Sequence, residues 1–400
     1  MNNIHPKVTP IYQTSVFKFA SLAELEEYYT APGRGGRYGY SRSEHPNAEE
    51  LVAAVAQLEG VAGGATAGVA TGAGLSGLLA AVLATCQAGD HVLCPAELYG
   101  GSVVLLSQEL GRLGIATDYV PLADLYDLAR YAKPTTRLVL AETLSNPLLT
   151  VLDGPRLARA CQAQGVLLLI DNTFATPVLS QPFTWGADLV WHSATKYLGG
   201  HSDVTAGLVL ARDPALAQRL RQVGGSLGLT LAPLESWLTL RGTKTLRLRL
   251  RQHSENALAV AQFLAAHPAV GQVFYPGLAT DPGHVLAAAQ LRGGMFGGML
   301  SFRLADDTEA AVDSFIQKSR LFPLAPSLAG VDSSLSYPLA TSHRHIPDEH
   351  RRALGITPGL IRLSVGIEEI EELLADLAQA LEQGPHRVVP ATQSSDVVNK

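Results

Sequence analysis

The sequence predicts an α/β protein whose main sheet is mostly parallel and sandwiched between helices. Short β-type runs alternate with stretches of helical period, and most of these runs are apolar on both faces. This alternation is typical of a parallel sheet, because its crossover helices bury both faces. Beyond about residue 245 the pattern changes, which predicts a smaller C-terminal α/β domain.

The chain divides into four predicted segments. Its length of 400 residues makes two domains the default. A stretch rich in Pro, Gly, Tyr and Arg predicts an extended N-terminal arm, and the unperiodic end of the chain predicts a polar tail. The predicted segments are an arm at 1–47, a cofactor-binding domain at 48–245, a C-terminal domain at 246–385 and a tail at 386–400.

The elements of the main domain follow in chain order. Helical period begins at Ala48 and ends at Gly60. The seven predicted strands are GVAT (68–71), HVLC (91–94), DYVPL (118–122), RLVLAET (137–143), VLLLID (166–171), DLVWHS (188–193) and GLVLA (207–211). Ligands of such sheets bind at the carboxyl ends of the strands. Asp171, Asn146 and the segment SATK fall there.

The C-terminal part has a different texture. FGGMLSFRL (296–304) and GLIRLSVGIE (359–368) predict strands of an antiparallel or mixed sheet, closed by an amphipathic helix at 368–383. TLRLRLRQH (245–253) alternates strictly, which favours a strand with an arginine face, but helical period follows directly and equally permits the start of a helix. A nucleic-acid-binding role for this stripe is disfavoured, since no aromatic residues interleave.

Composition excludes several classes of protein. A net charge of −6 gives no electrostatic reason to expect nucleic acid or an anionic membrane as partner. No apolar run is long enough to span a membrane, and the N-terminus lacks the pattern of a signal peptide. Cys86, Cys94 and Cys161 form no CxxC pair, so we expect free thiols in a reducing compartment, the cytoplasm.

The segment HSATKYLGG (192–200) is typical of a lysine that does chemistry, because it closes an apolar strand between hydroxyl residues and glycines. An aldehyde cofactor held on a lysine needs that amine, a phosphate cradle and an acid for its ring nitrogen. A buried Asp171 would be costly without such a cationic partner. The candidates are Lys196 for the amine, Ser193, Thr195 and the amides of Gly72 and Ala73 for the phosphate, and Asp171 for the ring nitrogen.

With these residues in place, the sequence resembles the transsulfuration family, the pyridoxal-phosphate enzymes of cysteine and methionine metabolism. The most specific stretch is SATKYLGGHSD, supported by AELYGG, ETLSNP, IDNTFATP and SLAG…SYP. The matching stretches run from YSR near residue 40 to RLSVGIE near residue 365. The resemblance implies fold type I, with a seven-stranded sheet between helices.

The resemblance also implies roles for individual residues. Lys196 would hold the cofactor and Asp171 would pair with its ring nitrogen, while Tyr99 would stack on the ring and assist proton transfer. The other implied positions are Asn146 near the phenolic oxygen, Arg362 on the substrate carboxylate, Ser327 near the lysine, and Tyr40 and Arg42 at the phosphate of a neighbouring subunit. A shared site implies an obligate dimer and a homotetramer built from dimers.

The implied activity is elimination of a thiol from a sulfur amino acid, of the cystathionine, homocysteine or methionine γ-lyase type, giving a 2-oxo acid and ammonia. The alternative is γ-replacement, as in a cystathionine γ-synthase or an O-acylhomoserine sulfhydrylase. The sequence departs from the family's usual residues at several positions: His45 and Asn47 follow YSR, Gly39 and Pro326 replace acidic residues of cystathionine-handling members, Gly101 replaces a cysteine of methionine-cleaving members, and Ala73 replaces a methionine.

Three other functions correspond to particular residues of the sequence. GAGLSG (72–77) is a formal G-x-G-x-x-G, so an NAD-binding oxidoreductase is a remote alternative, although no acid ends the following strand. A non-catalytic binding protein on the same fold is disfavoured by the complete set of reactive residues. His343, His345 and His350 fit no zinc-binding pattern, so we expect no metal.

Overall fold

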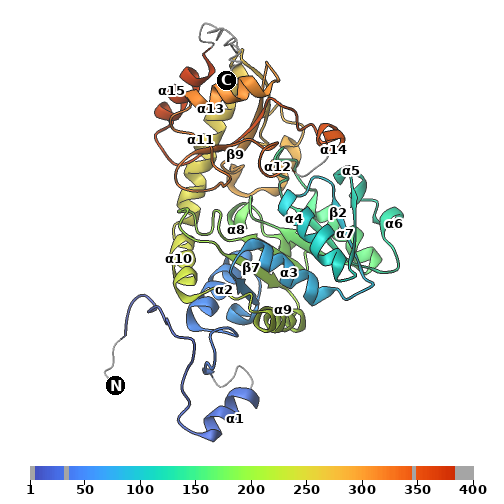
Figure 1. Ribbon diagram of the computed structural model, residues 1–400, viewed down its shortest axis with the longest axis vertical. Helices are drawn as coiled ribbons and strands as arrows, with labels where there is room; N and C mark the ends of the chain where they lie inside the picture. Colours follow the sequence, from blue (N-terminus) through green and yellow to red (C-terminus); the bar gives the residue numbers. More distant parts are fainter. Residues whose placement is uncertain (1–4, 31–35, 345–347, 383–400) are drawn as a thin grey trace, which may run out of the picture.

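The computed structural model describes residues 5–30, 36–344 and 348–382. Figure 1 shows a body built around the main sheet, a second group of strands and helices above it, and an N-terminal arm that runs away from the body and carries α1 (Leu22–Thr30). Over these described ranges, no helix is long and apolar enough to cross a membrane.

The main sheet has seven strands, in the order β1-β7-β6-β5-β4-β2-β3. The pairs β3–β2, β2–β4, β4–β5 and β5–β6 are parallel, whereas β7 is antiparallel to β6 and to β1. The predicted mostly parallel sheet is therefore confirmed, with ends shifted by a residue or two. Its strands are β1 (Gly68–Thr71), β2 (His91–Pro95), β3 (Ala116–Val120), β4 (Thr136–Glu142), β5 (Leu167–Asp171), β6 (Leu189–Ser193) and β7 (Gly207–Ala211).

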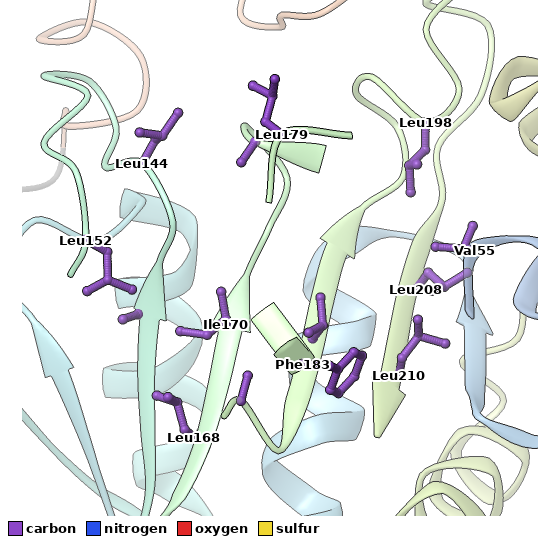
Figure 2. Packing of buried hydrophobic residues seen from close by; sticks show 14 of the residues in the cluster. Val55, Leu144, Leu152, Leu168, Ile170, Leu179, Phe183, Leu198, Leu208 and Leu210 are labelled. Carbon is purple, nitrogen blue, oxygen red and sulfur yellow. The ribbon is translucent and has the colours of Figure 1, made fainter. Parts of the chain in front are cut away.

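Hydrophobic residues cover both faces of this sheet, as the doubly apolar runs predict. On one face, Leu168 and Ile170 of β5 lie in a core with Leu208 and Leu210 of β7 (Figure 2). On the other face, Leu169 belongs to a separate core. Since successive side chains of a strand point to opposite faces, each strand feeds both cores.

Helices lie on both faces of the sheet. Side chains of α2 and α7 belong to the core of Leu168, and those of α3 and α9 belong to the core of Leu169. The helices of the main domain are α2 (Pro46–Glu59), α3 (Gly74–Thr85), α4 (Gly100–Val104), α5 (Leu122–Leu125), α6 (Leu128–Tyr131), α7 (Gly154–Gln164), α8 (Thr176–Leu179), α9 (Pro214–Leu227) and α10 (Pro233–Thr243). The first of them begins at Pro46, because His45 caps it by accepting from the Ala48 amide.

A second, antiparallel sheet of four strands has the order β10-β11-β9-β8. The predicted strands at 296–304 and 359–368 contain β9 (Met299–Leu304) and β11 (Leu360–Ser364). The edge strands β8 (Val270–Phe274) and β10 (Ser334–Ser336) were not predicted. Helices α13 (Glu309–Lys318) and α15 (Ile370–Leu381) contribute Phe315 and Leu377 to the core of this sheet. Ala287 of α12 (His284–Gln290) belongs instead to the core of the main sheet, and α14 (Asp348–Ala353) precedes β11 in the chain.

The alternating stretch TLRLRLRQH is helical, so the strand interpretation is wrong. It forms the start of α11 (Leu246–Ala266), the long helix that joins the two cores. Leu246 and Leu250 pack into the core of the main sheet, while Val260 packs into the core of the second sheet. A strand would place Leu246, Leu248 and Leu250 on one face, so all three would be buried together. Leu248 is instead 67% exposed, and the buried residues follow helical spacing.

The predicted domain boundaries remain a prediction. α11 begins where the C-terminal domain was expected to start, but its first turns pack with the main sheet. The N-terminal arm is not extended throughout, because it contains α1 and its last residues open α2. The predicted polar tail at 386–400 lies outside the described residues.

Candidate active site

A cavity of about 540 Å³ opens at the carboxyl ends of β4, β5 and β6, where the parallel strands predict a ligand site. It brings together most of the predicted site residues. Its lining includes Ala73, Tyr99, Asn146, Asp171, Ser193, Thr195, Lys196 and Arg362, together with Gly74, Leu75, Glu142, Leu144, Thr173, Phe174, Trp191, Thr205, Pro326, Leu328, Ala340, Thr341 and Ser342.

Lys196 lies in a tight turn between β6 and β7. The Lys196 amide donates to Ser193 O, and the Gly200 amide donates back to Lys196 O at 2.7 Å. Gly200 has a φ of +75° and a Cβ there would overlap the guanidinium of Arg249, so this position requires glycine. The Thr195 hydroxyl donates a hydrogen bond to Ala206 O and accepts one from the Ala206 amide. The turn therefore holds Lys196 in a fixed place at the strand end.

The amine of Lys196 points into the cavity and has one hydroxyl partner. Its Nζ donates to Ser327 Oγ at 3.1 Å, which places Ser327 beside the lysine as the resemblance implies. Burial first, and the positive charge of Arg362 second, together lower the pKa of Lys196 to about 8. About a tenth of this amine is therefore uncharged at pH 7, far more than for an ordinary lysine, and only the uncharged amine can act as a nucleophile or base.

Two carboxyl groups lie next to each other on the floor of the cavity. Glu142 and Asp171 are the last residues of β4 and β5 and are direct partners in the parallel ladder. Burial raises the pKa of both, and the Asp171 charge raises that of Glu142 further. The bond from the Thr173 amide (2.9 Å) and the nearby His192 oppose the rise in the pKa of Asp171. We therefore assign the negative charge of the pair to Asp171.

Arg362 reaches the cavity from β11 of the second sheet. Its Nη1 donates to Asn146 Oδ1 at 2.7 Å, and its side chain is only 5% exposed. Burial lowers the pKa of Arg362 to about 10, so it remains a cation at neutral pH. Its Nε is buried with no partner among the described residues. A buried guanidinium with a free donor is suited to bind a carboxylate.

The turn that opens α3 reaches the cavity with free amides. Ala73 is the N-cap and supplies no side-chain acceptor, so the first amides of the helix remain available. The Gly72 amide donates to Leu229 O at 2.9 Å, and Gly72 does not line the cavity. Gly74 lines the cavity instead, and the predicted use of the Gly72 amide at the phosphate stays a prediction.

Tyr99 precedes α4, lines the cavity and is 39% exposed. Tyr40 and Arg42 lie instead on the N-terminal arm and do not line this chain's cavity. The Arg42 guanidinium lies 5.4 Å from the centre of the Tyr40 ring and donates to Gly225 O. Their expected role at a neighbouring subunit stays a prediction.

Sequence reasoning missed two buried acids. Glu142 could have been found by the rule that selected Asp171, because it also ends an apolar strand. Glu59, fully buried at the end of α2, accepts from His192 Nε2 at 2.7 Å and from Asn172 Nδ2 at 2.8 Å. No local pattern predicts the contact between Glu59 and His192, since the two residues come from distant segments.

Of the three histidines that fit no zinc-binding pattern, His345 lies outside the described residues.

The residues of the cavity fit the phosphorylated aldehyde cofactor that the resemblance implies. Lys196 offers a partly uncharged amine. Asp171 has no ion-pair partner among the residues described, which suits a protonated ring nitrogen. The start of α3 has no side-chain cap, so its amides suit a phosphate. Gly74 lies so close to Ser193 that a Cβ at Gly74 would clash with the Ser193 side chain.

Comparisons with known proteins agree with this assignment. The family model described as Cys/Met metabolism PLP-dependent enzyme matches residues 2–382. The chain is 46% identical to a cystathionine beta-lyase of Lactococcus lactis subsp. cremoris over 94% of this chain and 93% of the relative. It is 43% identical to a cystathionine gamma-lyase of Bacillus subtilis, covering 93% of each chain.

Solved structures show the same fold. A cystathionine gamma synthase from Xanthomonas oryzae pv. oryzae in complex with cystathionine matches with a TM-score of 0.86 at 43% identity, over 94% of this chain and 92% of the other. A cystathionine gamma-lyase from Lactobacillus plantarum complexed with L-serine matches with a TM-score of 0.85 at 36% identity, over 93% and 92%. The predicted fold type is therefore confirmed.

The topology also explains why the remote NAD alternative is wrong. A dinucleotide-binding turn joins neighbouring parallel strands through its helix. Here the strand before GAGLSG is β1, an edge strand antiparallel to β7, and the next strand, β2, lies far across the sheet. From the family match over nearly its whole length, the chain belongs to the pyridoxal-phosphate-dependent enzymes of cysteine and methionine metabolism, and its cofactor is pyridoxal 5'-phosphate.

Proposed function

We propose that the protein is a carbon–sulfur lyase that eliminates a thiol from a sulfur amino acid and releases a 2-oxo acid and ammonia. The observation that carries this proposal is the arrangement of Lys196, Asp171 and Arg362 around one cavity. Sequence similarity to cystathionine lyases at 46% and 43% identity supports the class of substrate.

Each of these residues has a role in the proposed reaction. Pyridoxal phosphate, when bound, supplies an electron sink that stabilises negative charge on the carbons of the amino acid. Lys196 would hold the cofactor, and its Nζ would be the base that takes the proton from the substrate Cα and, for elimination at the γ-carbon, the proton from Cβ as well. The Asp171 carboxylate would pair with the ring nitrogen and keep it protonated. The Tyr99 hydroxyl donates a proton to the sulfur of the departing thiol.

Other residues position the two molecules. The amides at the start of α3, with Ser193 and Thr195, would hold the phosphate, and Asn146 would lie near the phenolic oxygen. Arg362 binds the substrate carboxylate, with Asn146 Oδ1 fixing its orientation. Ser327 accepts from Lys196 Nζ and so directs the amine.

Replacement of Arg362 by alanine is expected to raise KM for the amino acid about 10- to 100-fold, because a charged hydrogen-bonding partner of the carboxylate is lost. The clamp acts in ground state and transition state alike, so kcat should change little. Steady-state kinetics measures both constants. Arg303→Ala, on the neighbouring strand with its guanidinium over Phe274, is the matched control. An unchanged KM in Arg362→Ala would place the substrate carboxylate elsewhere.

The same residues also serve γ-replacement, which is the second candidate. It is favoured by the similarity to a cystathionine gamma synthase at 43% identity. Product analysis with L-cystathionine, L-homocysteine, L-methionine and O-acetyl-L-homoserine plus a thiol distinguishes the candidates. A γ-lyase releases 2-oxobutanoate and cysteine from cystathionine, a β-lyase releases pyruvate and homocysteine, and a replacement enzyme forms a thioether. Thioether formation without 2-oxo acid release would refute the proposed lyase.

We further propose that the active site is shared between subunits of a homodimer, with two dimers forming a tetramer. Tyr40 and Arg42 would reach the phosphate of a second copy. The apolar residues exposed on the arm support this, among them Val16 (54% exposed) and Tyr40 (47%).

We also propose that the protein lies in the cytoplasm, which the three buried free cysteines support.

Mixing two inactive variants tests the shared site. Lys196→Ala and Arg42→Ala should each have little activity alone. When the two are unfolded and refolded together, half of the dimers are mixed and each contains one intact site of two, so about a quarter of wild-type activity should return. Each variant refolded alone is the control. No recovery, despite mixed dimers seen by native mass spectrometry, would refute the shared site.

A further inference from the structure

Glu142 joins two segments of the candidate active site. It ends β4, is only 8% exposed, and its Oε1 accepts from the Tyr99 amide at 2.7 Å. This bond fixes the residue from which α4 begins, and with it the backbone that carries the Tyr99 phenol into the cavity. The Asn146 amide also faces the Glu142 carboxyl group.

The charged groups around Glu142 disfavour its ionisation. Asp171 faces it from the adjoining strand end. The backbone amides of Tyr99 and Asn146 favour the ionised form, but burial and the charge of Asp171 outweigh them and raise the pKa of Glu142. Lys196 and Arg362 line the same cavity, but neither forms an ion pair with Glu142 among the described residues. Two carboxylates side by side and largely buried cannot both ionise at low cost.

We infer that Glu142 is a positioning residue that holds the Tyr99 backbone as an uncharged carboxyl group beside the charged Asp171. This inference rests on the role proposed for Asp171 at the ring nitrogen. With Glu142 uncharged, Asp171 carries the negative charge of the pair, and no neighbouring carboxylate competes with it for the protonated ring nitrogen. The raised pKa of Glu142, caused by burial first and by Asp171 second, supports the same state.

Two substitutions separate position from charge. Glu142→Gln keeps an oxygen acceptor for the Tyr99 amide and is uncharged at every pH, so kcat/KM should stay within about threefold of wild type. Glu142→Ala removes the acceptor, and the displaced phenol should lower kcat/KM about 10- to 100-fold, mainly in kcat. Asp376→Asn is the matched control, because this carboxylate also accepts from backbone amides, those of Arg320 and Leu321, in the second core.

Two further readouts respond to the inferred role but not to a general loss of stability. The visible circular dichroism of the bound cofactor should change in Glu142→Ala and be retained in Glu142→Gln, since it reports the surroundings of the ring. The pH profile of kcat/KM for Glu142→Gln should superimpose on that of wild type. Equal kinetics and dichroism for Glu142→Ala and wild type would overturn the inference.

A Glu142→Gln variant as impaired as Glu142→Ala, or one whose pH profile is displaced, would also overturn it, because the carboxyl group would then act as a charge. This test holds even if Glu142→Ala fails to fold. Failure of the proposed function is distinguishable: it appears as unchanged activity in Asp171→Asn, whatever the result at Glu142.

Discussion

Replacement of Lys196 by alanine is expected to lower turnover by on the order of 10⁴-fold or more, because no other lysine of the described residues lines the cavity to hold the cofactor and move the substrate proton. The cofactor should also become removable by dialysis, since its covalent attachment is lost. Assays of 2-oxo acid release and of visible absorbance before and after dialysis measure the two effects.

A matched control separates this effect from the loss of any lysine. Lys244, at the end of α10, is exposed and lies outside the cavity lining, so Lys244→Ala should retain activity and bound cofactor. Retained turnover in Lys196→Ala would contradict the assignment, as would a loss of equal size in Lys244→Ala.

Replacement of Asp171 by asparagine is expected to lower kcat/KM about 10²- to 10³-fold, because the negative charge opposite the ring nitrogen is lost while the shape of the side chain is kept. A ring nitrogen without its proton withdraws electrons poorly from the substrate. Steady-state kinetics measures the loss, and the pH dependence of the cofactor's absorbance should change with it.

Asp188→Asn is the control for this substitution. Asp188 directly precedes β6, at the amino ends of the parallel strands and thus away from the cavity, and it accepts from the Leu168 amide at 2.8 Å. Its loss should affect stability and leave the absorbance unchanged. If Asp171→Asn had the activity of wild type, some other group would have to stabilise the ring nitrogen.

Much of the main sheet could be predicted because its strands are short, apolar on both faces and separated by helices. The edge strands of the second sheet could not, since β10 has only three residues and β8 is half exposed. The stretch at 245–253 was ambiguous because arginine and leucine alternate there. Only the packed structure shows Arg249 buried and donating to the carbonyls of Tyr197 and Gly242.

The residues of the candidate site could likewise be predicted only in part from the sequence. Lys196, Asp171 and Asn146 follow from the rule that ligands bind at the carboxyl ends of parallel strands. Arg362 does not, because it comes from a different sheet, and the family resemblance was needed to select it. Which amides of the turn before α3 are free could not be read from the sequence, since the partner of Gly72 is the distant Leu229.

The most direct test of the central claim is to locate the covalently held cofactor. The purified enzyme is treated with borohydride, which makes the attachment permanent, and is then digested and mapped by mass spectrometry. We predict the added mass of the reduced cofactor on the peptide that contains Lys196 and on no other lysine. Stoichiometric label on a different lysine, or none on an active enzyme, would contradict the account.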